Sequence, residues 1–169
     1  MKKANITLIG MPGAGKSTIG VILAKQLSYG FVDTDVLIQV HQQKTLQQIL
    51  DEKDHHHLRK IEEAEILSLN IDRHVIATGG SAVYSESGMA HLQRLSTIVF
   101  LQVRYEEIKR RIHNFDSRGI AKAKGQTFRA LFRERQPLYQ RYGELWINGE
   151  GFDQEQIAEQ IAAKIRGMG

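Results

Sequence analysis

The chain has 169 residues, 41% hydrophobic and 25% charged, and this ordinary globular mixture excludes a collagen-like, coiled-coil or disordered chain. The length suits one domain, so we expect residues 1–169 to form a single unit. Cysteine is absent, which excludes disulfides and thiol nucleophiles, and no apolar run approaches the length of a membrane span. We therefore expect a cytoplasmic protein without a membrane partner.

Charge is unevenly spread along the chain. The 23 basic and 19 acidic residues give a net charge of +4, yet residues 104–141 contain eleven Lys or Arg and four Asp or Glu, a local charge of +7. Such a basic block indicates that the protein binds an anionic partner. Alternatively, the block is a solvent-exposed helix face that binds nothing. The block shows no interleaved aromatic platform and no helix-turn-helix signature, so we expect a phosphorylated small molecule as the partner and no nucleic acid.

Short apolar runs alternate with amphipathic stretches. In chain order we expect a strand at 4–9, a helix at 16–27, a strand at 31–33, helices at 45–50 and 55–69, strands at 74–77 and 97–101, a helix at 105–113, a polar mobile loop at 112–126, helices at 128–135 and 138–142 separated by Pro137, a strand at 145–147 and a last helix ending near 165. Thr45, Asp54 and Asp153 are expected N-caps. This alternation predicts an α/β fold, a three-layer sandwich with a central parallel sheet of about five strands.

The segment Gly10-Met11-Pro12-Gly13-Ala14-Gly15-Lys16-Ser17 matches the phosphate-loop pattern G-x-x-x-x-G-K-[ST]. A predicted strand precedes it and a predicted helix follows it, as this motif requires. Its glycines let backbone N–H groups surround a phosphate, and the N-terminus of the helix adds positive potential. Lys16 would bridge the outer phosphates and the Ser17 hydroxyl would ligate Mg²⁺.

Two carboxylates follow the second predicted strand. In an extended chain Asp33 and Asp35 would point to one side. One would hold the Mg²⁺ shell through water and the other would accept a hydrogen bond from an attacking hydroxyl. The alternative is a pair that caps a helix over residues 36–40.

Two further segments carry candidate binding residues. Arg59 and Glu62 lie three residues apart on one predicted helix face, either as a surface ion pair or with Glu62 orienting Arg59 toward a substrate anion. Thr78-Gly79-Gly80 ends a predicted buried strand, where glycines permit close approach of a ligand, or form a plain turn.

Together these residues resemble the shikimate kinase family of phosphate-loop small-molecule kinases. The matching segments, in the order of the family from residue 4 to about 165, are 10–17 with Thr18, 31–35, 58–62, 77–80, Arg111, Arg118 and 134–139. The resemblance implies phosphate-loop kinase architecture with a mobile lid at about 112–126. It implies a monomer that phosphorylates a hydroxyl of shikimate with ATP and Mg²⁺, giving shikimate 3-phosphate for the biosynthesis of chorismate and aromatic amino acids.

The resemblance also implies roles for individual residues. ATP would bind to Gly13, Ala14, Gly15, Lys16, Ser17, Thr18, Arg111 and Arg118, with Arg111 stacked on adenine and Arg118 closing from the lid. Mg²⁺ would bind to Ser17 and Asp33. The acceptor would contact Asp35, Arg59, Gly79, Gly80 and Arg135, the two arginines clamping its carboxylate. Lys16, Asp35 and Arg118 would be catalytic.

Three departures from the family pattern leave the acceptor open. Ser81 stands where a third glycine is usual, Arg118-Gly119-Ile120-Ala121 replaces Arg-Pro-Leu-Leu in the lid, and Asn148-Gly149-Glu150-Gly151 lacks a clear adenine-loop pattern. The alternatives are a kinase of the same fold for another small hydroxy acid such as homoserine, and a non-catalytic nucleotide-binding sensor. The intact Lys16, Ser17, Asp33 and Asp35 disfavour a sensor.

Overall fold

A computed structural model describes residues 3–168, and the predicted domain limits at residues 1 and 169 lie outside this range. The elements in chain order are β1 (Asn5–Ile9), α1 (Lys16–Leu27), β2 (Gly30–Asp33), α2 (Thr34–Gln42), α3 (Leu46–Glu52), α4 (His55–Ser68), β3 (His74–Ala77), the 3₁₀ turn η1 (Ala82–Tyr84), α5 (Glu86–Leu95), β4 (Ser96–Gln102), α6 (Tyr105–Arg111), α7 (Phe128–Tyr142), β5 (Leu145–Asn148) and α8 (Gln154–Gly167). Every predicted strand is present, with ends shifted by one residue at most.

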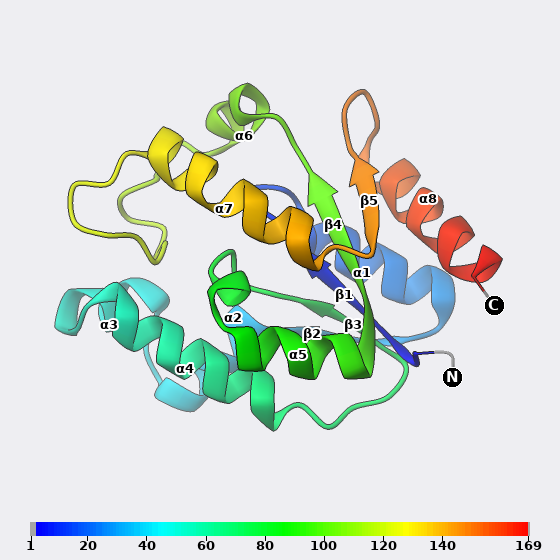
Figure 1. Cartoon of the computed structure of the whole chain (residues 1–169), viewed down its shortest axis with the longest axis horizontal. Helices are drawn as coiled ribbons and strands as arrows, with labels where there is room; N and C mark the ends of the chain where they lie inside the picture. The colour runs from blue at the N-terminus through cyan, green and yellow to red at the C-terminus, as the bar shows by residue number, and fades with distance from the viewer. Residues whose placement is uncertain (1–2, 169) are drawn as a thin grey trace.

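The five strands form one sheet in the order β2-β3-β1-β4-β5. All neighbouring pairs are parallel, as the alternation of strands and helices predicted. The carboxyl ends of the strands therefore meet at one edge, and the segments that follow β1, β2 and β3 are brought together there (Figure 1). In open parallel sheets this edge is the usual place for a ligand.

Helices cover both faces of the sheet, which confirms the predicted three layers. On one face α1 and α8 pack against the strands through a core that includes Leu8, Leu23, Val99 and Ile161. On the other face α4, α5 and α7 enclose a second core, which includes Ile66, Met89, Phe100 and Tyr139. The α7 helix crosses this second face diagonally in Figure 1. Within residues 3–168 the structure contains no helix that is long and apolar enough to cross a membrane.

The three predicted N-caps are confirmed. Thr45 and Asp153 each form a capping box with the glutamine three residues later, and Asp54 Oδ1 accepts a hydrogen bond from the His57 N–H at 2.8 Å. These caps satisfy backbone donors that a helix leaves without partners. Local sequence signals therefore set the starts of α3, α4 and α8.

Apart from shifts of one or two residues at helix ends, three helices differ from the prediction. The α7 helix runs through Pro137 without interruption, because it buries Leu131, Arg135 and Tyr139 along one face, and this packing outweighs the loss of one backbone hydrogen bond at proline. The α2 helix, which was expected only in the capping alternative, begins directly after β2. The α5 helix was not predicted. The signals for α5 are the N-cap Ser85 and the buried pair Met89 and Leu92 at helical spacing.

Candidate active site

The phosphate loop, residues 10–17, joins β1 to α1 at the carboxyl edge of the sheet. Gly13 and Gly15 have φ values of +83° and +95°, which side chains disfavour, so glycine is required at both positions. Lys16 is buried, and its Nζ donates hydrogen bonds to the carbonyl oxygens of Gly10 at 2.6 Å and Met11 at 2.8 Å. Because Gly15 is the N-cap of α1 and no side chain caps this helix, its first amides are available to an anion.

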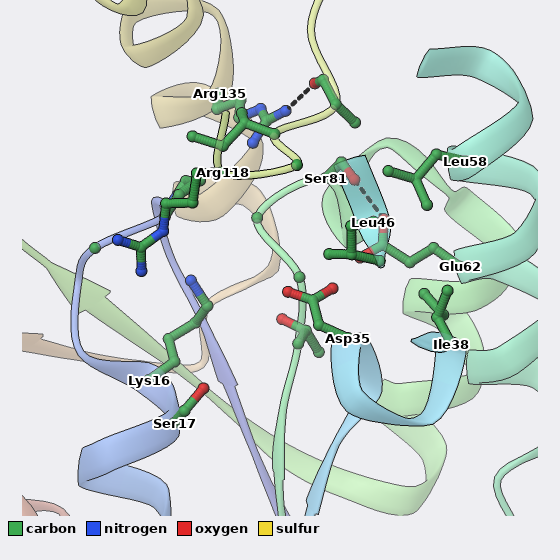
Figure 2. Close-up of a pocket in the computed structure, with 18 of the residues that line it drawn as sticks. Lys16, Ser17, Asp35, Ile38, Leu46, Leu58, Glu62, Ser81, Arg118 and Arg135 are labelled. Atoms are coloured by element: carbon green, nitrogen blue, oxygen red, sulfur yellow. Dashed lines mark hydrogen bonds between the residues drawn. The ribbon is translucent and has the colours of Figure 1, made fainter. Parts of the chain in front are cut away.

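Asp33 and Asp35 lie in different backbone settings. Asp33 is the N-cap of α2: its Oδ1 accepts a hydrogen bond from the Asp35 N–H at 3.0 Å, and its Oδ2 accepts one from Ser17 Oγ at 2.5 Å. Asp35 belongs to the first turn of α2 and lines the cavity (Figure 2). The prediction that both carboxylates project from one side of an extended strand was wrong, because the helix begins at Thr34. The alternative that Asp33 caps a helix is confirmed. The other carboxylate oxygen of Asp33, Oδ2, lies beside the Ser17 hydroxyl.

Asp35, Glu62 and Lys16 are buried charged groups around the same space. A Cβ on Gly79 would lie 2.6 Å from Asp35 Oδ1 and would also clash with Glu62 Oε1, so the two carboxyl groups flank this glycine. Burial raises the pKa of Asp35 to about 6, and the nearby Asp33 adds to the rise. Burial likewise raises the pKa of Glu62 to about 7, with Asp35 adding to it. Burial lowers the pKa of Lys16 to about 8, against the opposing effect of Asp35. Perturbed groups of this kind gather at functional sites.

Ser81, which stands where the family pattern usually has a third glycine, contacts a buried carboxylate. Its Oγ donates a hydrogen bond to Glu62 Oε2, while Glu62 Oε1 is buried without a partner. The preceding glycines are fixed by other contacts: the Gly79 N–H donates to Thr34 Oγ1 at 3.2 Å, and Tyr139 Oη donates to the Gly80 carbonyl at 2.6 Å. The Gly79 amide is thus already engaged, and it would have to exchange this hydrogen bond in order to reach a ligand.

The predicted lid segment, residues 112–126, contributes Arg118, Gly119, Ile120 and Ala121 to the cavity lining. Arg135 is fully buried, and its Nη2 donates a hydrogen bond to the Ala121 carbonyl of the lid at 2.5 Å. The Gly119 N–H donates to Gln47 Oε1 of α3 at 3.0 Å, so the lid also contacts the far wall. Gly119 has a φ of +73°, which proline cannot adopt, and this accounts for the absence of the usual lid proline. In Figure 2 the Arg118 side chain reaches from the lid toward Lys16.

Arg59 lies beside the cavity rather than in its lining. Its guanidinium stacks on the Tyr84 ring, 3.6 Å from the centroid, and its Nε is buried without a partner. Among residues 3–168 no ion pair joins Arg59 to Glu62, so the predicted orientation of Arg59 by Glu62 was wrong. The Glu62 carboxylate is instead buried and accepts a hydrogen bond from Ser81 Oγ.

The cavity enclosed by these segments has a volume of about 290 Å³. Eleven of the predicted site residues line it: Gly13, Gly15, Lys16, Ser17, Thr18, Asp35, Gly79, Gly80, Arg111, Arg118 and Arg135. Arg111 also lines an adjoining cavity with Ala14, Gly149 and Phe152. Asp33 and Arg59 do not line the main cavity, since Asp33 is turned toward Ser17 and Arg59 toward Tyr84.

Sequence reasoning missed the apolar part of this lining. Ile38, Leu46 and Leu58 form a wall from α2, α3 and α4, and Ile120 and Ala121 face it from the lid. In the sequence these residues look like the apolar positions of any helix or loop, so their spacing carried no signal for a site. Tyr84 was missed for the same reason, because a single aromatic residue after a turn has no distinctive pattern.

Comparisons with known proteins agree with this geometry. The sequence profile of a family described as shikimate kinase matches residues 12–166. A shikimate kinase from Sulfurihydrogenibium sp. is 32% identical over 163 residues, covering 96% of this chain and 98% of the relative. One from Paracidovorax citrulli is 33% identical over 167 residues, covering 95% and 91%. The structure of shikimate kinase from Acinetobacter baumannii in complex with shikimate superposes with a TM-score of 0.90 at 27% identity, covering 98% of this chain and 94% of that one. The chain therefore belongs to the shikimate kinase family.

Proposed function

We propose that this protein transfers the γ-phosphoryl group of ATP to a ring hydroxyl of shikimate in the cavity between the phosphate loop, α2, residues 78–81 and the lid. As a family member it is an ATP-dependent phosphotransferase. The observation that carries the proposal is the convergence of Lys16, Asp35 and Arg135 on one cavity. These residues supply a phosphate ligand, a proton acceptor and an anion-binding guanidinium from three separate segments.

The nucleotide side of the site is built by the phosphate loop. We assign the phosphates to the backbone amides of residues 13–18 and to Lys16, whose Nζ would exchange the carbonyls of Gly10 and Met11 for phosphate oxygens. Arg118 would approach the transferring group from the lid. Arg111, which reaches the Gly13 carbonyl at 3.4 Å and lines the adjoining cavity, would contact the adenine.

The residues beside the phosphate loop fit Mg²⁺. Hard divalent cations take oxygen ligands, and the Ser17 hydroxyl and an Asp33 carboxylate oxygen lie 2.5 Å apart next to the loop. We propose that these two groups hold the ion, Asp33 through water. When bound, Mg²⁺ would neutralise charge on the phosphates of ATP.

Asp35 and the two arginines would bind the acceptor. With a pKa of about 6, Asp35 is mainly ionised at pH 7 to 8, so it can accept a hydrogen bond from the acceptor hydroxyl and then its proton. The hydroxyl oxygen would bond to the γ-phosphorus while the bond from that phosphorus to the leaving oxygen of ADP breaks. Arg135 would bind the carboxylate in place of the Ala121 carbonyl, and its buried Nε, which has no partner, offers a further donor.

The acceptor is tested by ADP release with shikimate, homoserine, gluconate and nucleoside monophosphates, each at equal concentration with ATP and Mg²⁺. We expect kcat/KM for shikimate to exceed each of the others by at least about a hundred-fold, since hydroxyl- and carboxylate-binding sites strongly reject ligands that leave their groups unpaired. A higher value for another acid would assign the site to that acid. Nucleotide binding without turnover of any acceptor would support a sensor instead.

A monomer in the cytoplasm is also proposed. The phosphate loop, the proposed acceptor residues and the lid all line one cavity, so we expect a single copy of the chain to complete the site. We propose the cytoplasmic location because the sequence contains no cysteine, whereas many small secreted proteins are stabilised by disulfides. Light scattering coupled to gel filtration tests the monomer, and a stable dimer at micromolar concentration would contradict it.

A further inference from the structure

We propose that Tyr84 is a positioning residue that holds the guanidinium of Arg59 beside that of Arg135, so that the two together bind the carboxylate of the acceptor. This inference rests on the proposed function, because it assigns a supporting side chain to the same acceptor site. Tyr84 ends η1, the turn that follows residues 78–81, so it lies next to the cavity without lining it.

Both arginines lie near the face of the Tyr84 ring. The central carbon of the Arg59 guanidinium is 3.6 Å from the ring centroid, and that of Arg135 is 5.4 Å from it. Arg59 comes from α4 and Arg135 from α7, and η1 packs between these helices. The ring therefore joins two cations whose helices belong to different parts of the chain.

The ring itself is held in place. Tyr84 Oη donates a hydrogen bond to Glu134 Oε1, and Glu134 Oε2 accepts one from Gln126 Nε2 at 2.9 Å. The side chain is half-buried and its orientation is fixed at both the backbone and the hydroxyl end. A fixed ring restricts the guanidinium that stacks on it, which lowers the entropy cost of binding an anion.

Such a contact is needed because the two arginines repel each other. Burial lowers the pKa of Arg59 and the neighbouring charge of Arg135 lowers it further, while the negative charges of Glu134 and Glu62 act in the opposite direction. Among residues 3–168 no carboxylate forms an ion pair with Arg59 or Arg135. The negative face of an aromatic ring attracts a guanidinium without an ion pair.

A ring also leaves the arginine free to bind a ligand. A carboxylate partner would occupy the N–H groups in the guanidinium plane, which are the groups that bind an acceptor carboxylate in a bidentate manner. Stacking uses the face of the guanidinium and leaves its edge available. The Nε atoms of Arg59 and Arg135 are both buried without partners, as expected of donors kept free for a ligand.

The test compares Tyr84→Leu, which removes the ring, with Tyr84→Phe, which keeps it. A cation–π contact of about 1 kcal/mol corresponds to roughly a five-fold change in affinity. We expect Tyr84→Leu to raise KM for shikimate at least about five-fold and to leave KM for ATP within two-fold. Tyr84→Phe, which keeps the ring but loses its hydrogen bond to Glu134, should raise KM for shikimate clearly less than Tyr84→Leu does.

Two comparisons show that the effect passes through Arg59. In an Arg59→Gln background, the leucine substitution should change KM for shikimate by less than about two-fold. Tyr29→Leu is the matched control. The central carbon of the Arg73 guanidinium lies 5.6 Å from the centroid of the Tyr29 ring, but Tyr29 precedes β2 and so lies at the opposite edge of the sheet from the cavity. This control should leave both KM values unchanged. Melting curves confirm folding, and Tyr84→Met replaces the leucine variant if that variant unfolds.

The outcomes separate this inference from the proposed function. If the parent does not phosphorylate shikimate, both fail. If the parent does but Arg59→Gln leaves KM for shikimate unchanged, the inference alone is overturned, because Arg59 does not then bind the acceptor. If Arg59→Gln raises that KM, the inference is overturned by an unchanged KM in Tyr84→Leu, by an equal rise in KM for shikimate and for ATP, or by a rise that persists without Arg59. A lower KM in Tyr84→Leu would also overturn it, by showing that the ring holds Arg59 away from the acceptor.

Discussion

Gly119 in the lid gives the sharpest structural prediction, because its contacts define the lid position over the acceptor. Its φ is +73°, and a Cβ there would lie 2.6 Å from Leu46 Cβ and 3.0 Å from the Gln47 nitrogen. Placing alanine in this conformation costs roughly 1–2 kcal/mol, and the contact with Leu46 adds to that cost unless the lid moves away from α3. Gly119→Ala should therefore disfavour this lid position by about 2 kcal/mol or more.

Gly125 offers a matched control in the same segment. Its φ is +76°, but a Cβ there would meet no atom within 4 Å. Alanine at residue 125 has the same backbone strain whether or not the lid contacts α3. This strain therefore does not change the free-energy difference between the two lid positions. We expect Gly119→Ala to lower kcat/KM for shikimate about ten-fold or more at saturating ATP, and Gly125→Ala to lower it less than about two-fold. Equal losses in the two variants, or a Gly119→Ala enzyme within two-fold of the parent, would refute the reasoning.

Three further predictions concern the cavity. Lys16→Ala should lower kcat by at least about 10²–10³-fold with an unchanged circular dichroism spectrum, because a buried charge on the transferring phosphates is lost; turnover within two-fold of the parent would contradict this. The kcat of the parent should fall as pH decreases through about 6, since protonated Asp35 cannot accept the hydroxyl proton, and Asp35→Asn should lower kcat about 10²–10⁴-fold and abolish this dependence. If that variant loses only ATP affinity, Asp35 acts on the metal instead. Arg135→Lys should raise KM for shikimate about ten-fold or more, as a buried bidentate donor becomes a point charge, while KM for ATP stays unchanged; an equal rise in both would contradict an acceptor role.

Local signals in the sequence predicted much of this fold. The phosphate loop, the five strands and the caps at Thr45, Asp54 and Asp153 each depend on residues that lie within a few positions of one another. The capping alternative placed the start of α2 at residue 36, whereas the helix begins at Thr34, because Asp33 both ends a strand and caps the helix. Pro137 predicts an interruption between two helical segments, but the burial of Arg135 and Tyr139 along one face keeps α7 continuous.

The site was predicted less completely than the fold, for a physical reason. Residues that follow strands reach the carboxyl edge by topology, so Lys16 and Asp35 could be placed from the chain order alone. The partners of Glu62 and Arg59 depend on contacts between segments that are distant in sequence, with Ser81 and Tyr84 respectively. Neither contact has a spacing that can be recognised before the fold is known.

The mass of the reaction product tests the central claim most directly. The protein is incubated with ATP, Mg²⁺ and shikimate, with Lys16→Ala as the blank, and both products are quantified by mass spectrometry. We predict that shikimate gains one phosphoryl group and that ADP forms in equal amount, with neither product above the blank when shikimate is omitted. ADP that forms while shikimate stays unmodified, or no ADP at all, would contradict phosphoryl transfer to shikimate in this cavity.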